Sequence, residues 1–462
     1  MRSEVGQPSG PSAVFSSCAV AVFFIAGAFA QSSDVQAGGP ESQWRGLPET
    51  SGTISLESAY GTAENTLQKL CLELVLRLTG AISHTTDYTV IGRLRADPVF
   101  DNGHLDGTDF PDVSEATRPL RIGETAELEL REAYIRTTWN DWHLTLGKQQ
   151  IVWGLADGLK VIDVVNPQDL REFILTDFEN SRLPLWAVNA ERPIGDWNLQ
   201  VVWVPDPSYY ILPRQESEFE FSAGVPSVPP GFALEYKPAS RPSGLDEISD
   251  AGFRLSTFKA GWDLTFNYLY HYDDVPVFPR SLCLTDDGPT VVVTPEYRRS
   301  HLIGGTASKA FGDFTLRAEY GLFTDKYYPT GSLLDADGVV KGNDLSYMIG
   351  VDWFGISNTV VSFQLFQDWF TNDSRGVERD EIQTYTTLAV HRRLLNDTLT
   401  LQSIWFQDLN HGDGLLRPKI TYAVNDRVSV YAGADFFYGS ANGFFGQFDS
   451  KDRIYCGLTW SF

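Results

Sequence analysis

Charged side chains at alternate positions are the residues of this sequence best placed to do chemistry. Between residues 67 and 79, leucines occupy every second position from Leu70 to Leu78, and Lys69, Glu73 and Arg77 lie among the residues between them. A period of two puts the leucines on one face of a β-strand and the charged residues on the other. Charges of both signs on one polar face attract, repel and orient solutes without a bond-making step. The pattern predicts strands that separate an apolar environment from a polar one.

The same alternation predicts further charged residues on this polar face. The candidates for contact with a solute are Arg77, Arg93, Arg95, Arg317 and Glu319. Other polar residues predicted on that face are Lys69, Glu73, Asn198, Gln200, Arg254, Asp263, Asn267, Asp352, Gln364, Asp368, Gln402, Arg417, Lys419 and Asp435. Solvation of a wet wall requires the same residue types, so alternation alone leaves a solute-contacting role and a simple hydrated wall open.

The segment 154–183 is a second source of candidate residues, because it is long and charged and lies between two alternating stretches. Asn166 followed by Pro167 is typical of a helix cap and the first helical position, which predicts a short helix from Pro167 to Leu175. If the segment folds inward, it gates the lumen and sets its charge selectivity through Lys160, Asp163, Asp169, Arg171, Glu172 and Asp177. If it lies outside, the same residues are solvated surface charges, and both arrangements stay open.

The sequence shows no motif for bond chemistry, metal binding or a cofactor. The 7 histidines are scattered, with no HExxH motif, and no serine lies in a glycine-flanked elbow. The cysteines beyond residue 30, Cys71, Cys283 and Cys456, form no CxxC pair. We therefore predict no catalytic residue, no metal and no cofactor. His301 and His391 are predicted on the polar face and would be the candidates if a neighbouring strand brought a serine to one of them.

Residues 1–30 are predicted to be a secretory signal peptide. Arg2 lies in a polar start, an apolar stretch runs from Ala13 to Ala26, and Ala28-Phe29-Ala30 offers small residues before the cleavage site. Residues 31–51 then form a periplasmic N-terminal extension, and residues 52–462 form the folded part. No later apolar run is long enough to cross a bilayer as a helix, whereas 13% aromatic residues and 40 glycines suit strands and turns.

Alternating segments and turn signals predict an all-β fold, a transmembrane antiparallel β-barrel of about eighteen strands. Very short connections such as Asn140-Asp141 join pairs of strands, and longer polar stretches separate successive hairpins. Outer-membrane barrels typically have short periplasmic turns and long extracellular loops. They also have an even number of strands, which puts both termini on the short-turn side. The predicted strands are 52–60, 66–79, 87–97, 126–138, 142–153, 184–192, 197–205, 250–257, 262–272, 300–309, 314–323, 344–353, 358–369, 381–392, 397–407, 415–424, 427–437 and 452–462.

The last predicted strand carries a candidate signal for membrane assembly. Ile454, Cys456, Leu458, Trp460 and Phe462 occupy alternate positions, so the strand ends on an outward aromatic residue. An alternating strand that ends in Phe resembles the signal that the outer-membrane assembly machinery recognises. Phe462 is therefore the predicted membrane-assembly residue. Tryptophans near other strand ends fit the aromatic girdles of the two membrane interfaces.

Three motifs carry a family resemblance: Leu130-Arg131-Glu132-Ala133-Tyr134-Ile135, then Gly147-Lys148-Gln149-Gln150-Ile151-Val152-Trp153-Gly154, then Val165-Asn166-Pro167. On these motifs the chain resembles a largely uncharacterised proteobacterial outer-membrane β-barrel family, a porin-like domain of unknown function. The similarity is strongest from about residue 126 to 205. It implies an outer-membrane location and a barrel, and it implies no substrate and no functional residue.

The formal net charge of −24 argues against nucleic acid as a partner, because both surfaces would repel each other. The expected partners are the lipid bilayer, lipopolysaccharide, the outer-membrane assembly machinery and a small-molecule solute. The sequence favours a porin-like channel in the outer membrane of a Gram-negative cell, which passively transports small polar or amphipathic solutes and is not an enzyme. A plugged structural or adhesive barrel and an outer-membrane hydrolase are the alternatives, and the solute and the oligomeric state stay open.

Overall fold

The computed structural model describes residues 48–99, 112–214, 217–221, 231–242, 249–285, 288–330, 337–372, 376–377 and 379–462. The predicted signal peptide, 1–30, and the predicted extension up to residue 47 lie outside these residues. Strand β1 begins at Glu49, which pairs with Thr79 of β2. The first strand therefore begins three residues before the predicted boundary at residue 52.

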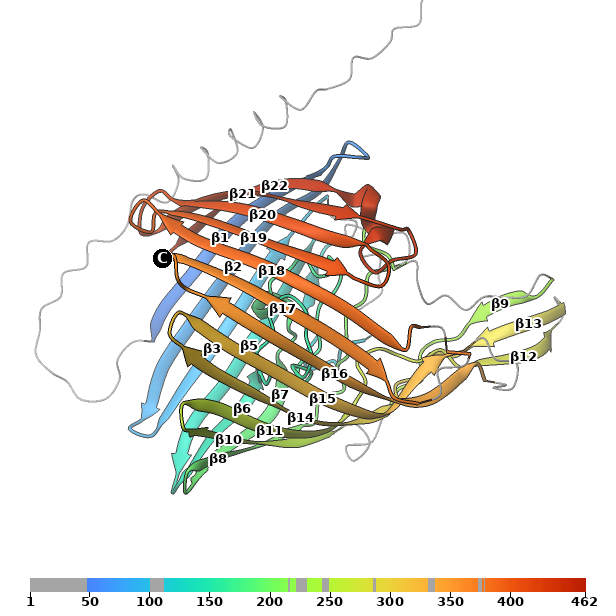
Figure 1. Ribbon diagram of the computed structural model, residues 1–462, viewed down its shortest axis with the longest axis horizontal. Coiled ribbons are helices and arrows are strands. Elements are labelled where there is room, and N and C mark those ends of the chain that lie inside the picture. The colour runs from blue at the N-terminus through green and yellow to red at the C-terminus, as the bar shows by residue number, and fades with distance from the viewer. Residues whose placement is uncertain are drawn as a thin grey trace, which may run out of the picture.

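Eighteen of the described strands form one closed antiparallel barrel, which confirms the predicted fold class and strand number (Figure 1). Strand β1 pairs with β2 on one side and with β22 on the other, so the barrel sheet has no free edge. The barrel strands are β1 Glu49–Gly61, β2 Thr66–Ser83, β3 Thr86–Ala96, β5 Ala126–Trp139, β6 Trp142–Gln149, β7 Leu185–Ile194, β8 Trp197–Val204, β10 Asp250–Lys259, β11 Trp262–Tyr272, β14 Arg299–Phe311, β15 Phe314–Pro329, β16 Val339–Trp353, β17 Thr359–Phe370, β18 Ile382–Leu394, β19 Leu399–Asp408, β20 Gly414–Ala423, β21 Val428–Tyr438 and β22 Arg453–Ser461.

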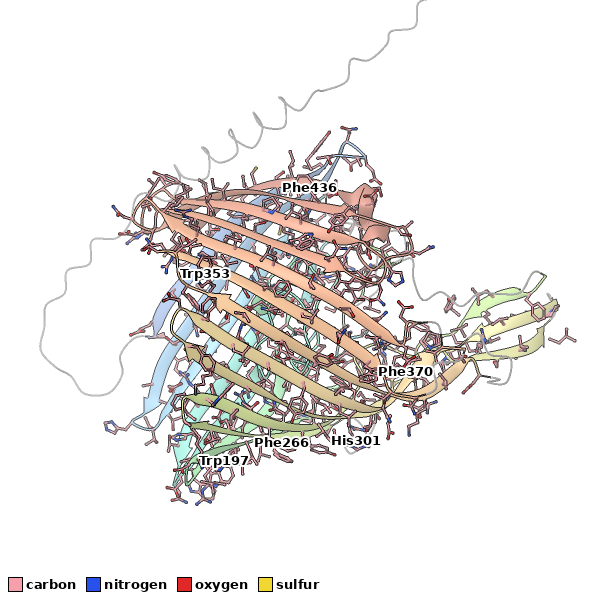
Figure 2. All side chains as sticks on the ribbon, viewed as in Figure 1. Trp197, Phe266, His301, Trp353, Phe370 and Phe436 are labelled. Atoms are coloured by element: carbon pink, nitrogen blue, oxygen red, sulfur yellow. The ribbon has the colours of Figure 1, made fainter. Side chains whose placement is uncertain are left out.

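Alternation along the strands gives the wall an apolar outer face. Leu72 and Leu76 of β2 are 41% and 36% exposed, although both are large apolar side chains. Phe266 of β11 and Phe363 of β17 are exposed in the same way, and Figure 2 shows Phe266 on the outside of the wall. A soluble protein rarely exposes a continuous apolar band of this kind, so the outer face is suited to lipid.

Short turns lie at one end of the barrel, the short-turn end, and long connections lie at the other, the long-loop end. Asn140 and Gly261 have left-handed φ values of 53° and 81°, which Asn and Gly tolerate, and each lies in a two-residue hairpin connection. The C-terminal end of β22 is at the short-turn end, on the left of Figure 1. On the right of Figure 1, a small sheet of β9 Ala233–Tyr236, β12 Arg280–Thr285 and β13 Gly288–Val293 projects away from the barrel.

The sequence predicts loops where this projecting sheet and the short strand β4 Leu120–Ile122 lie. In the projecting sheet, β13 pairs in parallel with β9, and Thr290 lies opposite Ala233. The two paired strands are far apart in the sequence and are not joined by a turn. The sequence therefore lacks the signal of two alternating segments with a turn between them, and periodicity does not reveal this pairing. No helix in the described part of the chain is long and apolar enough to cross a bilayer.

Candidate functional site

Residues 150–183, between β6 and β7, lie inside the barrel, and we call them the inner segment. They bond to inward-facing side chains of Lys69 in β2, Glu319 in β15 and Arg417 in β20. These three strands lie on different sides of the barrel. A segment that contacts all of them crosses the lumen, so of the two arrangements left open by the sequence the structure has the inward one.

The inner segment leaves the wall because β6 ends at Gln149. Gly147 has φ 130°, and a Cβ atom there would lie 2.2 Å from the Ala133 carbonyl oxygen, so only glycine fits. Beyond this point the Ile151 N–H donates to Asn166 Oδ1 at 2.7 Å instead of to a neighbouring strand. The predicted strand 142–153 is therefore wrong from residue 150 onward.

The helix predicted from Pro167 to Leu175 does not form. Asn166 does not cap it, because its side-chain amide donates to the Leu183 carbonyl oxygen at 2.8 Å and its oxygen is occupied by Ile151. Gln168 forms an antiparallel bridge with Arg182 instead of a helical turn. Polar contacts across the inner segment thus replace the local capping contacts on which the prediction depended.

The first half of the inner segment is held on an apolar patch of the inner wall. Cβ atoms added at Gly304 of β14 or Gly321 of β15 would lie 3.1 and 2.8 Å from Ile162 Cγ2, so these glycines form a recess for Ile162. The patch consists of Ile151, Trp153, Val161, Ile162 and Val165 from the inner segment and of Leu185, Ala187, Val202, Val204, Leu269, Leu302, Phe323, Met348 and Phe366 from the wall. Burial of one large apolar side chain contributes about 1.5–3 kcal/mol, so this half is a firmly attached part of the barrel.

Glu319 of β15 clamps the same half through backbone hydrogen bonds. Its carboxylate accepts from the N–H groups of Leu155 at 2.5 Å, Ala156 at 3.1 Å and Ile162 at 2.7 Å. Because Glu319 is 1% exposed, these backbone dipoles take the place of water around its charge. Arg317, on the same face of β15, donates to the Leu155 carbonyl oxygen at 2.6 Å. Together the two side chains fix the backbone of the inner segment against one wall.

Ion pairs hold the second half of the inner segment. Glu172 lies 2.8 Å from Lys69 Nζ, 2.6 Å from Arg95 Nη2 and 3.3 Å from Arg453 Nη1, which come from β2, β3 and β22. We call these four residues the Glu172 latch. Burial alone would raise the pKa of Glu172, but the three cations outweigh burial and hold its pKa well below its usual range. Glu172 therefore stays charged at neutral pH.

Four of the other charged residues predicted for this segment have largely buried side chains in ion pairs: Lys160, Asp163, Asp169 and Arg171. Asp177 is exposed. Arg171 lies 2.6 Å from Asp169 and 3.1 Å from Glu127 of β5. Asp163 lies 2.6 Å from Arg182 and 3.2 Å from Lys160, and burial lowers the pKa of Lys160 despite this neighbouring carboxylate. These four ion-paired residues hold the shape of the inner segment rather than face the cavity.

Aromatic rings pack between the inner segment and the long-loop ends of β19, β20 and β21. The Phe173 ring centroid lies 4.8 Å from that of Phe448 and 5.0 Å from that of Phe444. Phe173 has φ 53°, an unfavourable backbone conformation that this packing offsets. We call the cluster the aromatic plug, and its buried members are Phe173, Leu175, Phe219, Phe406, Leu415, Phe437, Phe445 and Phe448.

A cavity of about 1030 Å³ lies between the inner segment and the short-turn end. Thr53, His391 and Thr459 line it near the short-turn ends of their strands, and the helix α2 Phe178–Ser181 of the inner segment contributes Glu179. The basic lining residues come mainly from β2, β3, β20 and β22: Lys69, Arg93, Arg95, Arg417, Lys419 and Arg453. The acidic lining residues include four from the inner segment and one from β16: Asp157, Glu172, Asp177, Glu179 and Asp352. The cavity has the volume of a small-molecule site and charges of both signs.

Five predicted site residues line this cavity: Glu172, Asp177, Arg93, Arg95 and Arg317. Five other predicted site residues hold the inner segment in place instead: Glu319, Lys160, Asp163, Asp169 and Arg171. Arg77 is exposed and lies nearer the short-turn end of β2, outside the cavity lining. Glu57 and Arg453 also line the cavity, but they are not among the site residues predicted from the sequence. The signal for Glu57 is its position two residues after Ser55 and four after Thr53, which is the spacing of residues on the inner face.

His301 lies on the outer face, so its predicted inward position is wrong. It pairs with the outward Tyr270 of β11, the two ring centroids are 4.7 Å apart, and Figure 2 shows His301 at the edge of the wall. The neighbouring Leu302 is the inward residue and is fully buried. A shift of one residue in the phase of a strand moves every side chain to the opposite face, which explains the error. His391 does line the cavity.

A family model matches residues 76–443, and the family is described as a protein of unknown function, DUF1302. The matched range includes the motifs at 130–135, 147–154 and 165–167 and the whole inner segment. The resemblance to a largely uncharacterised family is therefore confirmed. No curated protein matches the chain.

Solved structures with a similar fold are porin-like barrels. OccAB2 of Acinetobacter baumannii has a TM-score of 0.52 and 10% identity, with 90% of this chain and 98% of that chain covered. OccK5 (OpdH) of Pseudomonas aeruginosa has a TM-score of 0.46 and 11% identity, with 90% and 97% covered. OmpF of Salmonella typhi, in a complex with daunomycin, has a TM-score of 0.42 and 10% identity, with 90% and 97% covered. The likeness to OccAB2 supports the porin-like fold and no further property.

Proposed function

This chain belongs to the DUF1302 family, whose function is unknown. From the geometry we propose that the protein is an outer-membrane channel that passively transports small polar or amphipathic solutes. The observation that carries this proposal is the charged cavity of about 1030 Å³ inside a closed barrel. A polar inner wall of this kind favours contact with water and polar solutes only. No bond-making step is part of the proposal.

The outer-membrane location is supported by the apolar outer face and by its aromatic residues. Trp197 and Trp353 lie near the short-turn end, where the rings fit a membrane interface (Figure 2). Phe462 is 42% exposed, and its ring centroid lies 5.1 Å from that of Trp460. We propose Phe462 as the residue that the assembly machinery recognises, with the bilayer and lipopolysaccharide as the surroundings of the finished barrel.

The size limit follows from the inner segment and the aromatic plug, which occupy the lumen toward the long-loop end. We propose the Glu172 latch as the movable part of this obstruction. The latch consists of polar contacts that water can replace, although Phe173 and Leu175 beside it pack into the aromatic plug. Residues 151–165 are held by apolar burial and also by the Glu319 carboxylate. Apolar lining residues such as Val360, Val390 and Ile404 lie beside the charged ones, which suits an amphipathic solute.

Replacing Lys419 by glutamate tests whether the cavity lies on the path of a solute. Lys419 Nζ lies 4.5 Å from the Tyr431 ring centroid, and no carboxylate of the described residues forms an ion pair with it. Its charge therefore acts on mobile ions. In planar bilayers across a KCl gradient, the substitution is expected to shift the reversal potential toward cation selectivity, because the lining loses a positive charge and gains a negative one.

The matched control is Lys259 of β10, an exposed residue beside a short turn and away from the cavity lining. Lys259→Glu is expected to leave the reversal potential nearly unchanged. Equal shifts from both variants would show that the current does not pass through the cavity. An absence of current in the wild type would favour a plugged adhesive barrel or a hydrolase over the channel.

A further inference from the structure

We infer that Asp408, His411 and Asp413 form a binding site for a divalent transition-metal ion at the long-loop end of the barrel. Asp408 is the last residue of β19, and His411 and Asp413 lie in the short connection to β20. One ligand atom from each residue lies within 4.8 Å of the other two. This site is separate from the cavity, and its occupation does not depend on the proposed transport function.

The two carboxylates of this site are buried without a matching positive charge. Asp408 is 2% exposed and Asp413 is fully buried. Among the described residues, their only ion-pair partner is His411, whose Nδ1 lies 3.0 Å from Asp408 Oδ2. Asp380 adds a third carboxylate 3.8 Å from His411 Nε2. Asp380 is 46% exposed, so the buried surplus comes from Asp408 and Asp413. One partly exposed imidazole does not balance two buried carboxylates, and a buried surplus of negative charge is costly unless a cation accompanies it.

Asp413 provides a second, independent indication of a missing ligand. Its Oδ2 accepts from the N–H groups of Phe445 at 2.6 Å and Gly446 at 2.9 Å, whereas the buried Oδ1 has no hydrogen-bond partner among the described residues. A Cβ atom at Gly443 would lie 2.5 Å from Oδ2 and 2.8 Å from Oδ1, so only glycine lets the backbone pass this close to the carboxylate. A buried carboxylate oxygen without a donor is rare unless it binds an ion or a water molecule.

The ligand types indicate which ion fits. An imidazole nitrogen together with carboxylate oxygens favours Zn²⁺ or a similar transition-metal ion over Mg²⁺ or Ca²⁺, which prefer oxygen ligands alone. Ligands about 2.0–2.1 Å from Zn²⁺ in a tetrahedral site lie about 3.3 Å apart. The separation of 3.0 Å between His411 Nδ1 and Asp408 Oδ2 is close to this value. The exposed His411 can move toward Asp413 to close the rest of the site, and water would complete the coordination.

The position of the site suggests what the ion does. Asp413 joins the β19–β20 connection to the β21–β22 connection through the backbone of Phe445, and Phe445 belongs to the aromatic plug. An ion held by Asp408, His411 and Asp413 would fix the Asp413 carboxylate, which accepts from the backbone of the β21–β22 connection. It would thereby stabilise the aromatic plug above the inner segment.

Calorimetric titration of the full chain in detergent with Zn²⁺, after treatment with a chelator, tests the inference. We expect saturable binding of a single ion per chain and an increased melting temperature. His411→Ala is expected to weaken this binding by about tenfold or more, as loss of a metal ligand should cost at least as much as loss of a supporting contact. Asp413→Asn is expected to do the same while retaining an oxygen acceptor for the N–H groups of Phe445 and Gly446.

The matched control is His84→Ala, which removes an exposed imidazole at the short-turn end. This variant is expected to bind Zn²⁺ as the wild type does. The inference is overturned if the wild type shows no saturable binding below about millimolar Zn²⁺. It is also overturned if His411→Ala binds as tightly as the wild type, or if Ca²⁺ binds in preference to Zn²⁺.

Discussion

Replacing Glu172 by lysine is expected to free the second half of the inner segment and to increase the single-channel conductance in planar bilayers. The substitution would place a fourth cation among Lys69, Arg95 and Arg453, which now surround the carboxylate. Breaking a buried ion pair by removing one partner costs about 3–5 kcal/mol. A cost of that size changes the ratio of attached to released segments by a factor of about 10² to 4 × 10³.

Glu179→Lys is the matched control for this experiment. Glu179 is also a carboxylate of the inner segment that lines the cavity, but among the described residues its side chain forms no ion pair. We expect this variant to change charge selectivity and to leave the size of the conductance steps nearly unchanged. If both variants raised the conductance equally, the Glu172 latch would not be what holds the segment.

The wild-type latch is expected to be insensitive to mild acid. The pKa of Glu172 in the folded protein lies below its usual value, so the stabilisation is present above the usual pKa and is lost only as the pH falls through the lowered one. Conductance steps should therefore stay constant between about pH 8 and pH 5. A step that grew steadily over this range would point to another titrating group.

Replacing Glu319 by alanine is expected to detach the first half of the inner segment. The N–H groups of Leu155, Ala156 and Ile162 would lose the carboxylate that accepts from them. Each buried donor left without a partner costs about 1–3 kcal/mol. Residues 154–162 should then become accessible to proteases added to the refolded protein, and the conductance should increase.

Glu319→Gln provides the comparison, because it keeps one acceptor oxygen at the same place. Its effects are expected to lie between those of the wild type and of Glu319→Ala. Continued protection of the inner segment in Glu319→Ala would mean that the apolar patch around Ile162 holds this half without the clamp.

The barrel itself could be predicted from sequence because its signals are local. The predicted strand 262–272 coincides with β11 Trp262–Tyr272, where aromatic and polar residues alternate without a break. Turn residues such as Asn140 and Gly261 lie where the backbone takes a left-handed conformation. Each such signal is contained in a few consecutive residues, and neighbouring strands then pair in order around the barrel.

The place of the inner segment could not be predicted, because the contacts that hold it join distant positions. Glu172 and Lys69 are separated by 103 residues, and Ile162 and Glu319 by 157. Buried charges in this segment are indistinguishable in sequence from solvated charges in a surface loop. The inward apolar residues Leu302 and Met348 were likewise not expected, since an inner face is predicted to be polar until something is known to pack on it.

The prediction of a short helix at Pro167 failed for a related reason. Asn166 has the right residue type for a helix cap, but its side chain is bonded to Ile151 and Leu183, on either side of it in the chain. Local signals are reliable where the backbone has only local partners. Inside this lumen, tertiary contacts decide the conformation.

Single-channel conductance of the refolded wild type beside a variant that lacks residues 156–180 tests the central proposal most directly. If the chain is a channel narrowed by its inner segment, the wild type gives small steps and the deletion gives larger ones, since the deletion removes the Glu172 latch and Phe173 of the aromatic plug. Equal steps from both proteins would mean that the segment does not limit the current. No current from either protein would contradict the channel and leave the plugged barrel or the hydrolase.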